Sequence, residues 1–165
     1  MNNPIRMFMG TAVTVVLISA TAVLSSNPVY HTIPPGTGVL KFSFSHGGAR
    51  SCRQRTEKEL AKLPPNMKRK EICDRRRQPV YVELEIDGKM AVSALLPPSG
   101  LAGDGPSRIY ERFPLRAGEH DIAVRLRDTN RTDGFDYTAE RRLSITAEQS
   151  RAIDFRAENG GFTFN

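Results

Sequence analysis

Hydrophobic and polar residues alternate along most of the chain beyond residue 38. The cleanest run is VYVELEI at residues 80–86, in which every second residue is aliphatic, as in a strand with one buried face. The Asp87-Gly88 pair that follows is typical of a tight hairpin turn. Six more segments show the same alternation: residues 40–44, 90–94, 107–115, 120–127, 135–145 and 153–155.

The seven segments lie at roughly ten-residue spacing with turns between them, which is the pattern of a β-sandwich. We therefore predict a mainly β fold, a seven-stranded antiparallel sandwich of the Ig-like or transthyretin-like kind, over residues 38–165. Arg141 interrupts the alternation of residues 135–145. A charge on the inward side predicts that this strand lies near an edge of its sheet.

An insertion separates the first two predicted strands. Residues 47–78 supply 32 residues where a hairpin connection needs about two to five. The sequence TEKE from Thr56 matches a capping box and predicts a short helix, which the following Pro-Pro pair ends. We expect Leu60 and Leu63 of this helix to face the sheet.

The N-terminal segment is apolar. Residues 7–24 carry no charged side chain, and none occurs between Arg6 and Lys41. A helix over these 18 residues would span about 27 Å, close to the ~30 Å hydrocarbon core of a bilayer. We predict a single membrane anchor. The alternative is a cleaved signal peptide with Ala20-Thr21-Ala22 as its cleavage site.

Both interpretations place the rest of the chain outside the cytoplasm. The amino terminus and Arg6 supply the positive charges expected to stay inside. We predict a bacterial inner-membrane protein that crosses once, with a cytoplasmic N-terminus and a periplasmic C-terminal domain. The predicted parts are the anchor or signal peptide at 1–25, a linker at 26–37 and the sandwich domain at 38–165, with its insertion at 47–78.

Positive charge is concentrated in the insertion. Residues 50–77 hold 11 Lys or Arg and four Asp or Glu, a net charge of +7 against +6 for the whole chain. Such a patch attracts an acidic protein surface or anionic lipid. Nucleic acid is not expected as a partner, because the domain is predicted to lie outside the cytoplasm and the patch lacks interleaved aromatic residues. The predicted contact residues are Arg53, Arg55, Lys68, Arg69, Lys70, Arg75, Arg76 and Arg77. The alternative is a solvated loop whose charge only maintains solubility.

The two cysteines flank the predicted helix. In an exported domain Cys52 and Cys73 are expected to form a disulfide, which would close a 22-residue loop and contribute about 3 kcal/mol. The alternatives are two free thiols, or a soft-metal site in which His46 and Met67 join both thiols, a ligand set that suits Cu(I). Because the spacing fits no compact metal motif, we favour the disulfide and expect no metal or cofactor.

One stretch resembles a known family. Residues 115–126 (LRAGEHDIAVRL) are similar to the turn-and-strand signature of PEGA-type extracytoplasmic sandwich modules, in which a Gly-x-His turn precedes an alternating strand. The resemblance covers less than a tenth of the chain and does not include the insertion. It implies an accessory sandwich module and supplies no active site.

No catalytic motif is present. The sequence has no Gly-x-Ser-x-Gly elbow. The Gly-rich residues 97–106 lack the Lys-Ser/Thr of a P-loop. Residues 128–136 have Asp133 at the sixth position, where an EF-hand loop needs glycine. We expect a non-enzymatic accessory or assembly module for a larger envelope or respiratory complex, with a protein partner in or at the membrane. The alternatives are a periplasmic copper-handling protein and a carbohydrate- or wall-binding module.

Overall fold

The structure, a computed structural model, describes residues 4–27 and 33–165. The chain divides into two units, 1–34 and 35–165, and each is described by itself. Residues 28–32 of the predicted linker lie outside the described residues, so the linker stays a prediction.

The first unit is one apolar helix, α1 (Pro4–Ser26), which confirms the predicted apolar helix and extends it at both ends. It is long and apolar enough to cross a bilayer. Its threonine hydroxyls do not need water, because those of Thr11, Thr14 and Thr21 donate to backbone carbonyls one turn earlier, at 3.0, 2.9 and 2.7 Å. Internal hydrogen bonds of this kind lower the cost of placing polar groups in hydrocarbon.

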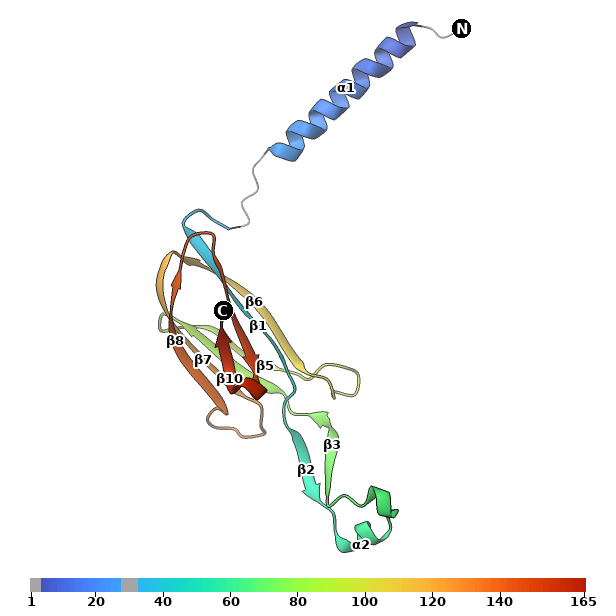
Figure 1. The fold of residues 1–165 in the computed structure, drawn as a ribbon, viewed down its shortest axis with the longest axis vertical. Helices are drawn as coiled ribbons and strands as arrows, with labels where there is room; N and C mark the ends of the chain where they lie inside the picture. Colours follow the sequence, from blue (N-terminus) through green and yellow to red (C-terminus); the bar gives the residue numbers. More distant parts are fainter. Residues whose placement is uncertain (1–3, 28–32) are drawn as a thin grey trace. The chain divides into compact units, whose positions relative to one another are not determined.

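The second unit (Figure 1) contains two four-stranded sheets. One sheet has the order β10-β9-β1-β6 and the other β5-β4-β7-β8. The strands are β1 (Thr37–His46), β4 (Val80–Ile86), β5 (Lys89–Leu96), β6 (Ser107–Arg116), β7 (Gly118–Arg127), β8 (Tyr137–Ile145), β9 (Ser150–Arg156) and β10 (Gly161–Phe164), with a short 3-10 helix η2 (Ala157–Asn159) before β10.

The alternation seen in the sequence is the alternation of burial in the sandwich. In β4 every second side chain is buried, from Val80 to Ile86. Aliphatic and aromatic side chains of both sheets fill the space between them, and their burial is the main driving force for folding. The buried hydrophobic residues are Val39, Leu40, Phe42, Phe44, Val80, Val82, Leu84, Ile86, Ile122, Val124, Leu126, Ile145, Ile153 and Phe155.

Two details of the sandwich differ from the prediction. The described residues contain eight sandwich strands rather than seven, because Gly161–Phe164 pairs with β9 as a short eighth strand. The pairing of β1 with β9 is parallel, whereas the other pairs are antiparallel. Alternation within one strand specifies its buried face and carries no information about the direction of its neighbour. The predicted edge position of Arg141 is confirmed, since β8 ends its sheet.

The β4–β5 turn has the predicted geometry. Asp87 and Gly88 both have positive φ, at 52° and 73°, as a type I′ turn requires. Asp87 also accepts from the backbone N–H of Asp121 at 3.0 Å, and its carboxylate lies 2.7 Å from Nδ1 of His120. The side chain of Asp87 therefore ties this turn to β7.

The insertion forms a second hairpin outside the sandwich, which Figure 1 shows extending from one end of it. Its elements are β2 (Arg50–Gln54), α2 (Glu57–Ala61), the 3-10 helix η1 (Pro65–Met67) and β3 (Glu71–Arg77). Thr56 and Glu59 form the predicted capping box. The expectation that Leu60 and Leu63 face the sheet is wrong: both are half-buried, and α2 has no buried residue, because the helix lies at the hairpin tip.

Candidate functional site

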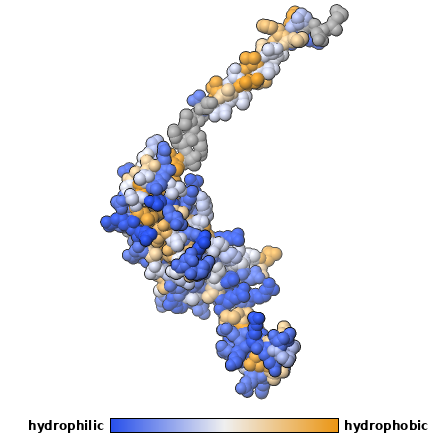
Figure 2. Space-filling view, viewed as in Figure 1, coloured by the Kyte–Doolittle hydropathy of each residue, from blue (hydrophilic) through white to orange (hydrophobic). Residues whose placement is uncertain are grey.

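The candidate site is the cationic hairpin, which we define as residues 50–77. β2 pairs with β3 in a two-stranded sheet separate from the sandwich. No residue of β2 is buried, and in β3 only Arg77 is even half-buried. The hairpin therefore presents most of its side chains to solvent, and Figure 2 shows its visible face as mostly hydrophilic.

The predicted disulfide joins the two hairpin strands. Cys52 and Cys73 are bonded and stand opposite each other in the register of β2 and β3. An exposed two-stranded hairpin is only marginally stable in water. The disulfide therefore stabilises a hairpin that has no hydrophobic core of its own.

The structure does not assemble the alternative metal set. Both sulfurs are in the disulfide, and Nε2 of His46 lies 2.7 Å from the Asp128 carboxylate at the end of the sandwich. Met67 is at the hairpin tip and 58% exposed. Within the described part of the chain, one set of His, Cys, Asp and Glu residues has ligand atoms close enough for a metal, Cys52, Glu71 and Cys73, and its two sulfurs are bonded to each other.

Some hairpin cations have partners inside the hairpin. Arg53 donates to the Glu59 carboxylate through its two terminal guanidinium nitrogens, at 2.8 and 3.1 Å. These bonds, with the N–H of Thr56, lower the pKa of the Glu59 carboxyl to about 2. Arg55 donates to the carbonyl of Arg69 at 3.2 Å. Arg53 and Arg55, both predicted contact residues, are thus held in part by the hairpin itself.

Arg77 anchors the hairpin to the sandwich domain. Its side chain donates to the carbonyls of Asp104 and Gly48, at 3.0 and 3.1 Å, and is half-buried. Its backbone N–H donates to Gly103 at 2.9 Å. Arg75 makes a longer ion pair with Asp104, at 3.2 Å, and its side chain is 86% exposed. The charge count does not distinguish these two arginines. Their contacts do, because Arg77 holds the hairpin to the sandwich whereas the side chain of Arg75 is mostly exposed.

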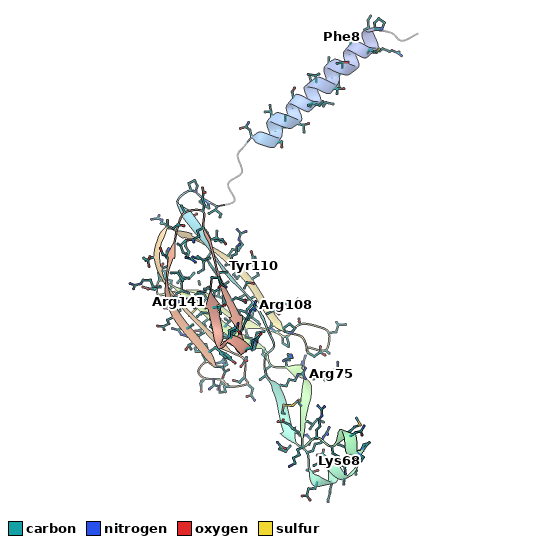
Figure 3. All side chains as sticks on the ribbon, in the orientation of Figure 1. Phe8, Lys68, Arg75, Arg108, Tyr110 and Arg141 are labelled. Atoms are coloured by element: carbon teal, nitrogen blue, oxygen red, sulfur yellow. A yellow bond between two sulfur atoms is a disulfide. The ribbon has the colours of Figure 1, made fainter. Side chains whose placement is uncertain are left out.

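The tip of the hairpin carries cations that are available to bind a partner. Lys68, Arg69 and Lys70 are consecutive and exposed, and no ion pair or side-chain hydrogen bond holds them among the described residues. Figure 3 shows Lys68 at the far end of the hairpin and Arg75 nearer the sandwich. The structure thus shows that these three predicted contact residues, consecutive in the sequence, are all exposed. Arg76, at the hairpin base, is likewise exposed and has no ion pair with any residue that the structure describes.

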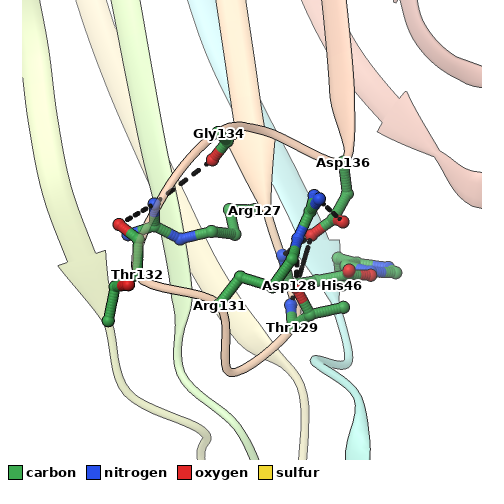
Figure 4. Close-up of polar contacts among 8 residues, drawn as sticks. All are labelled: His46, Arg127, Asp128, Thr129, Arg131, Thr132, Gly134 and Asp136. Carbon is green, nitrogen blue, oxygen red and sulfur yellow. Dashed lines mark hydrogen bonds and ion pairs between the residues drawn. The ribbon is translucent and has the colours of Figure 1, made fainter.

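A second polar cluster lies in the loop after β7, drawn in Figure 4. The Asp136 carboxylate accepts from the backbone N–H groups of Asp128 and Thr129, at 3.0 and 3.3 Å, and pairs with Arg131. Burial raises the pKa of Asp136, but these donors together outweigh it and lower the pKa. Donors already occupy the carboxylate that a cation would need, so this cluster closes a loop.

Sequence reasoning missed one feature near the hairpin base. Arg76 and Arg77 line a groove of about 570 Å³ together with Pro97, Pro98 and Leu101 of the β5–β6 loop. The proline and glycine content of residues 97–106 indicated a loop, but no local pattern pointed to the segment it would face.

No family model, no curated protein and no solved structure matches this chain. The resemblance of residues 115–126 to PEGA-type modules therefore stays a prediction.

Proposed function

We propose that this protein is a non-enzymatic, membrane-anchored accessory module whose cationic hairpin binds an acidic protein surface of a larger envelope or respiratory complex. The observation that carries the proposal is the exposed run Lys68-Arg69-Lys70, which has no acidic partner among the described residues. Solubility alone can be provided by acidic and basic side chains alike. A run of positive charges alone, on a hairpin held by a disulfide, favours an anionic partner.

The compartment belongs to the same proposal. A bilayer-length apolar helix, with Arg6 in its first turn and no further charge until Lys41, supports a single-pass anchor with the N-terminus inside. The Cys52–Cys73 disulfide supports an oxidising compartment for the domain. We assign the protein to the bacterial inner membrane with the sandwich in the periplasm.

The sandwich itself fits the transthyretin-like expectation better than the Ig-like one. A constant-type immunoglobulin domain has its first strand beside its second and seven strands in all. Here β1 lies between β6 and β9, and the two sheets have four strands each. We therefore propose a transthyretin-like sandwich with an added hairpin.

The two alternative functions have less support. A copper-handling role needs the thiols of Cys52 and Cys73, which are bonded to each other. A carbohydrate-binding role favours a platform of aromatic side chains, whereas the sequence has no Trp and four Tyr, of which Tyr110 is exposed.

The test reverses the tip charges in the full-length protein. The variant K68E/R69E/K70E is compared with R108E/R112E/R116E, which makes the same change in net charge on exposed residues of β6. We expect the first variant to lose its co-purifying partner from detergent-solubilised membranes, and the second to retain it. The wild-type complex should weaken as salt is raised, since exposed charges are screened. Equal retention by both variants at low and high salt contradicts the proposal, and loss by both indicates a non-specific charge effect.

Anionic lipid is the other outcome of the same experiment. The wild-type and both variants are mixed with vesicles of neutral lipid, with and without anionic phosphatidylglycerol. Binding that follows the anionic lipid and is lost with K68E/R69E/K70E, with no protein partner recovered, would replace the acidic protein by a membrane surface.

A further inference from the structure

The four edge strands of the sandwich are protected to different degrees. An exposed edge offers unpaired backbone N–H and C=O groups to another chain. On one side β8 and β10 end their sheets, and the guanidinium of Arg141 on β8 lies over the ring of Phe164 on β10, 5.4 Å from its centre. These two edges meet each other across the sandwich.

The other two edges are β5 and β6. β6 has the usual protection, with Pro114 and four charged residues among ten. β5 has no charge and no proline after Lys89: its sequence from Met90 is MAVSALL. Of these residues Leu95 is 63% exposed and Met90 52% exposed. After Lys89, β5 is therefore an apolar edge with neither charge nor proline to protect it.

The regular part of this edge ends at the groove. A bulge in the β4–β5 ladder falls at Ala91, so an added strand would find regular pairing from Val92 to Leu96. Leu95 also lines the groove described above, whose apolar wall is formed by prolines and Leu101. Leu101 is fully exposed. Arg76 and Arg77 also line the groove, with Asp74 as the one acid among its lining residues.

We infer that β5 is a strand-addition site for an extended, acidic peptide segment, which pairs with Val92–Leu96 and places carboxylates beside Arg76. Strand addition uses backbone hydrogen bonds for affinity and side-chain pockets for specificity. Arg76 is exposed and has no ion pair among the described residues, so its guanidinium is available for a carboxylate. The apolar wall would take an aliphatic side chain of the same segment.

Charge favours a foreign acidic segment over a second copy of this chain. Each end of the exposed edge carries a cation, Lys89 at one end and Arg76 at the other. Antiparallel pairing of two β5 strands about the middle of Val92–Leu96 would bring Lys89 of each copy toward the groove of the other. Like charges brought together in this way oppose association.

The inference builds on the proposed function, since it names the part of the acidic partner that docks, but it is tested apart from the hairpin tip. The probe is the synthetic peptide acetyl-EETVTVTEE-amide, added to the full-length protein in detergent micelles. Binding is measured by calorimetry, and the site by hydrogen exchange of the β5 amides. Two peptides serve as controls: KKTVTVTKK, and the acidic sequence with both valine nitrogens methylated.

We expect the acidic peptide to bind and to slow exchange in Val92–Leu96, and both controls to fail. Methylation removes backbone donors without changing charge, so an N-methylated peptide that binds equally well would overturn strand addition. The variant R76E should weaken binding roughly tenfold, as expected for loss of a facing charge. The variant R112E, the same change on an exposed residue of β6, should leave binding unchanged, and equal weakening by both would overturn the assignment to the groove.

The remaining outcomes separate the two proposals. If the acidic peptide leaves β5 exchange unchanged while K68E/R69E/K70E still loses its partner, the strand-addition site is wrong and the proposed function stands. If the peptide protects β5 but the triple variant keeps its partner, the tip is not the binding surface. Protection of β5 that rises with protein concentration alone would show self-pairing and overturn the acidic occupant.

Discussion

The sandwich and the cationic hairpin belong to one chain but are stabilised by different means. The sandwich buries aliphatic and aromatic side chains from both sheets, and Ser107, the buried polar residue among those described, donates its hydroxyl to the Leu96 carbonyl at 2.9 Å. The hairpin buries no side chain and depends on a disulfide, a capping box and the anchor at Arg77. A segment that contributes nothing to the core and still has a defined structure is what the proposed partner-binding role requires.

The comparison predicts that core substitutions have the largest effect. Leu84 is fully buried, and Leu84→Ala should lower the free energy of unfolding by about 2–5 kcal/mol. Met90 lies on the adjacent strand but is 52% exposed, so Met90→Ala should change it by about 0.5 kcal/mol or less. Urea unfolding of both variants measures the difference. Similar values for the two would mean that the core is not where the structure places it.

Removal of the disulfide should affect the hairpin far more than the sandwich. We expect the double change Cys52→Ala and Cys73→Ala to cost at most about 3 kcal/mol, the chain-entropy value for a loop of this size. Hydrogen exchange should become fast in β2 and β3 and stay slow in β4 and β7. Loss of protection in all four strands would show that the sandwich needs the braced hairpin.

The two neighbouring arginines at the hairpin base should respond differently. Arg77 donates to two backbone carbonyls, and Arg77→Ala would leave these acceptors unpaired, at a cost of about 1–3 kcal/mol. Arg76→Ala should change stability by about 0.5 kcal/mol or less. Thermal unfolding of the two variants tests this difference. An equal loss of stability in both would contradict the structural role given to Arg77.

The smallest expected effect is a pH dependence confined to the sandwich. Nε2 of His120 lies 2.8 Å from the Arg116 carbonyl and Nδ1 lies 2.7 Å from the Asp87 carboxylate. The Arg116 carbonyl, followed by Asp87, raises the pKa of His120 above 6.5, and the His120 bond lowers the pKa of Asp87 below 3.8. Both ring nitrogens face acceptors, which favours the doubly protonated ring.

The two pKa shifts determine how the stability of the folded state changes with pH. The folded state holds the His120 proton more tightly, so this contribution is complete below pH 6.5 and is lost as pH rises through the higher folded pKa. The Asp87 contribution is present above pH 3.8 and is lost as pH falls through its lower folded pKa. The melting temperature should therefore fall from about pH 5.5 to about pH 8.5, and His120→Gln should flatten that fall. An equal slope in wild type and variant would assign the dependence to other groups.

The sequence was informative where one strand or turn determines its own structure. Alternation at residues 80–86 predicted β4, Asp87-Gly88 predicted its turn, and the TEKE segment predicted the start of α2. The parallel β1–β9 pairing and the eighth strand were not predictable, because they depend on which distant segments meet and not on local pattern.

The candidate site divides in the same way. Charge counting identified the insertion, and the expectation that the domain is exported led to the prediction of the disulfide. Charge counting could not separate Arg77 from Arg76, because the difference lies in carbonyls that the fold brings from Gly48 and Asp104. The edge at β5 was also beyond local reasoning, since a strand becomes an edge only through the order of the sheet.

The central claim is that the hairpin serves a partner and not the fold, and a hairpin-less protein tests it most directly. Arg50 and Arg77 are partners in the β2–β3 register, so residues 51–76 can be replaced by Asn-Gly, a two-residue turn that suits such a pair and keeps the Arg77 anchor. The measurement is the amount of partner recovered with this variant from solubilised membranes, with urea unfolding as the check on its fold. We predict cooperative unfolding close to that of the wild type and no recovered partner. Undiminished recovery of the partner with the hairpin-less protein would contradict the claim, and so would a variant that no longer folds.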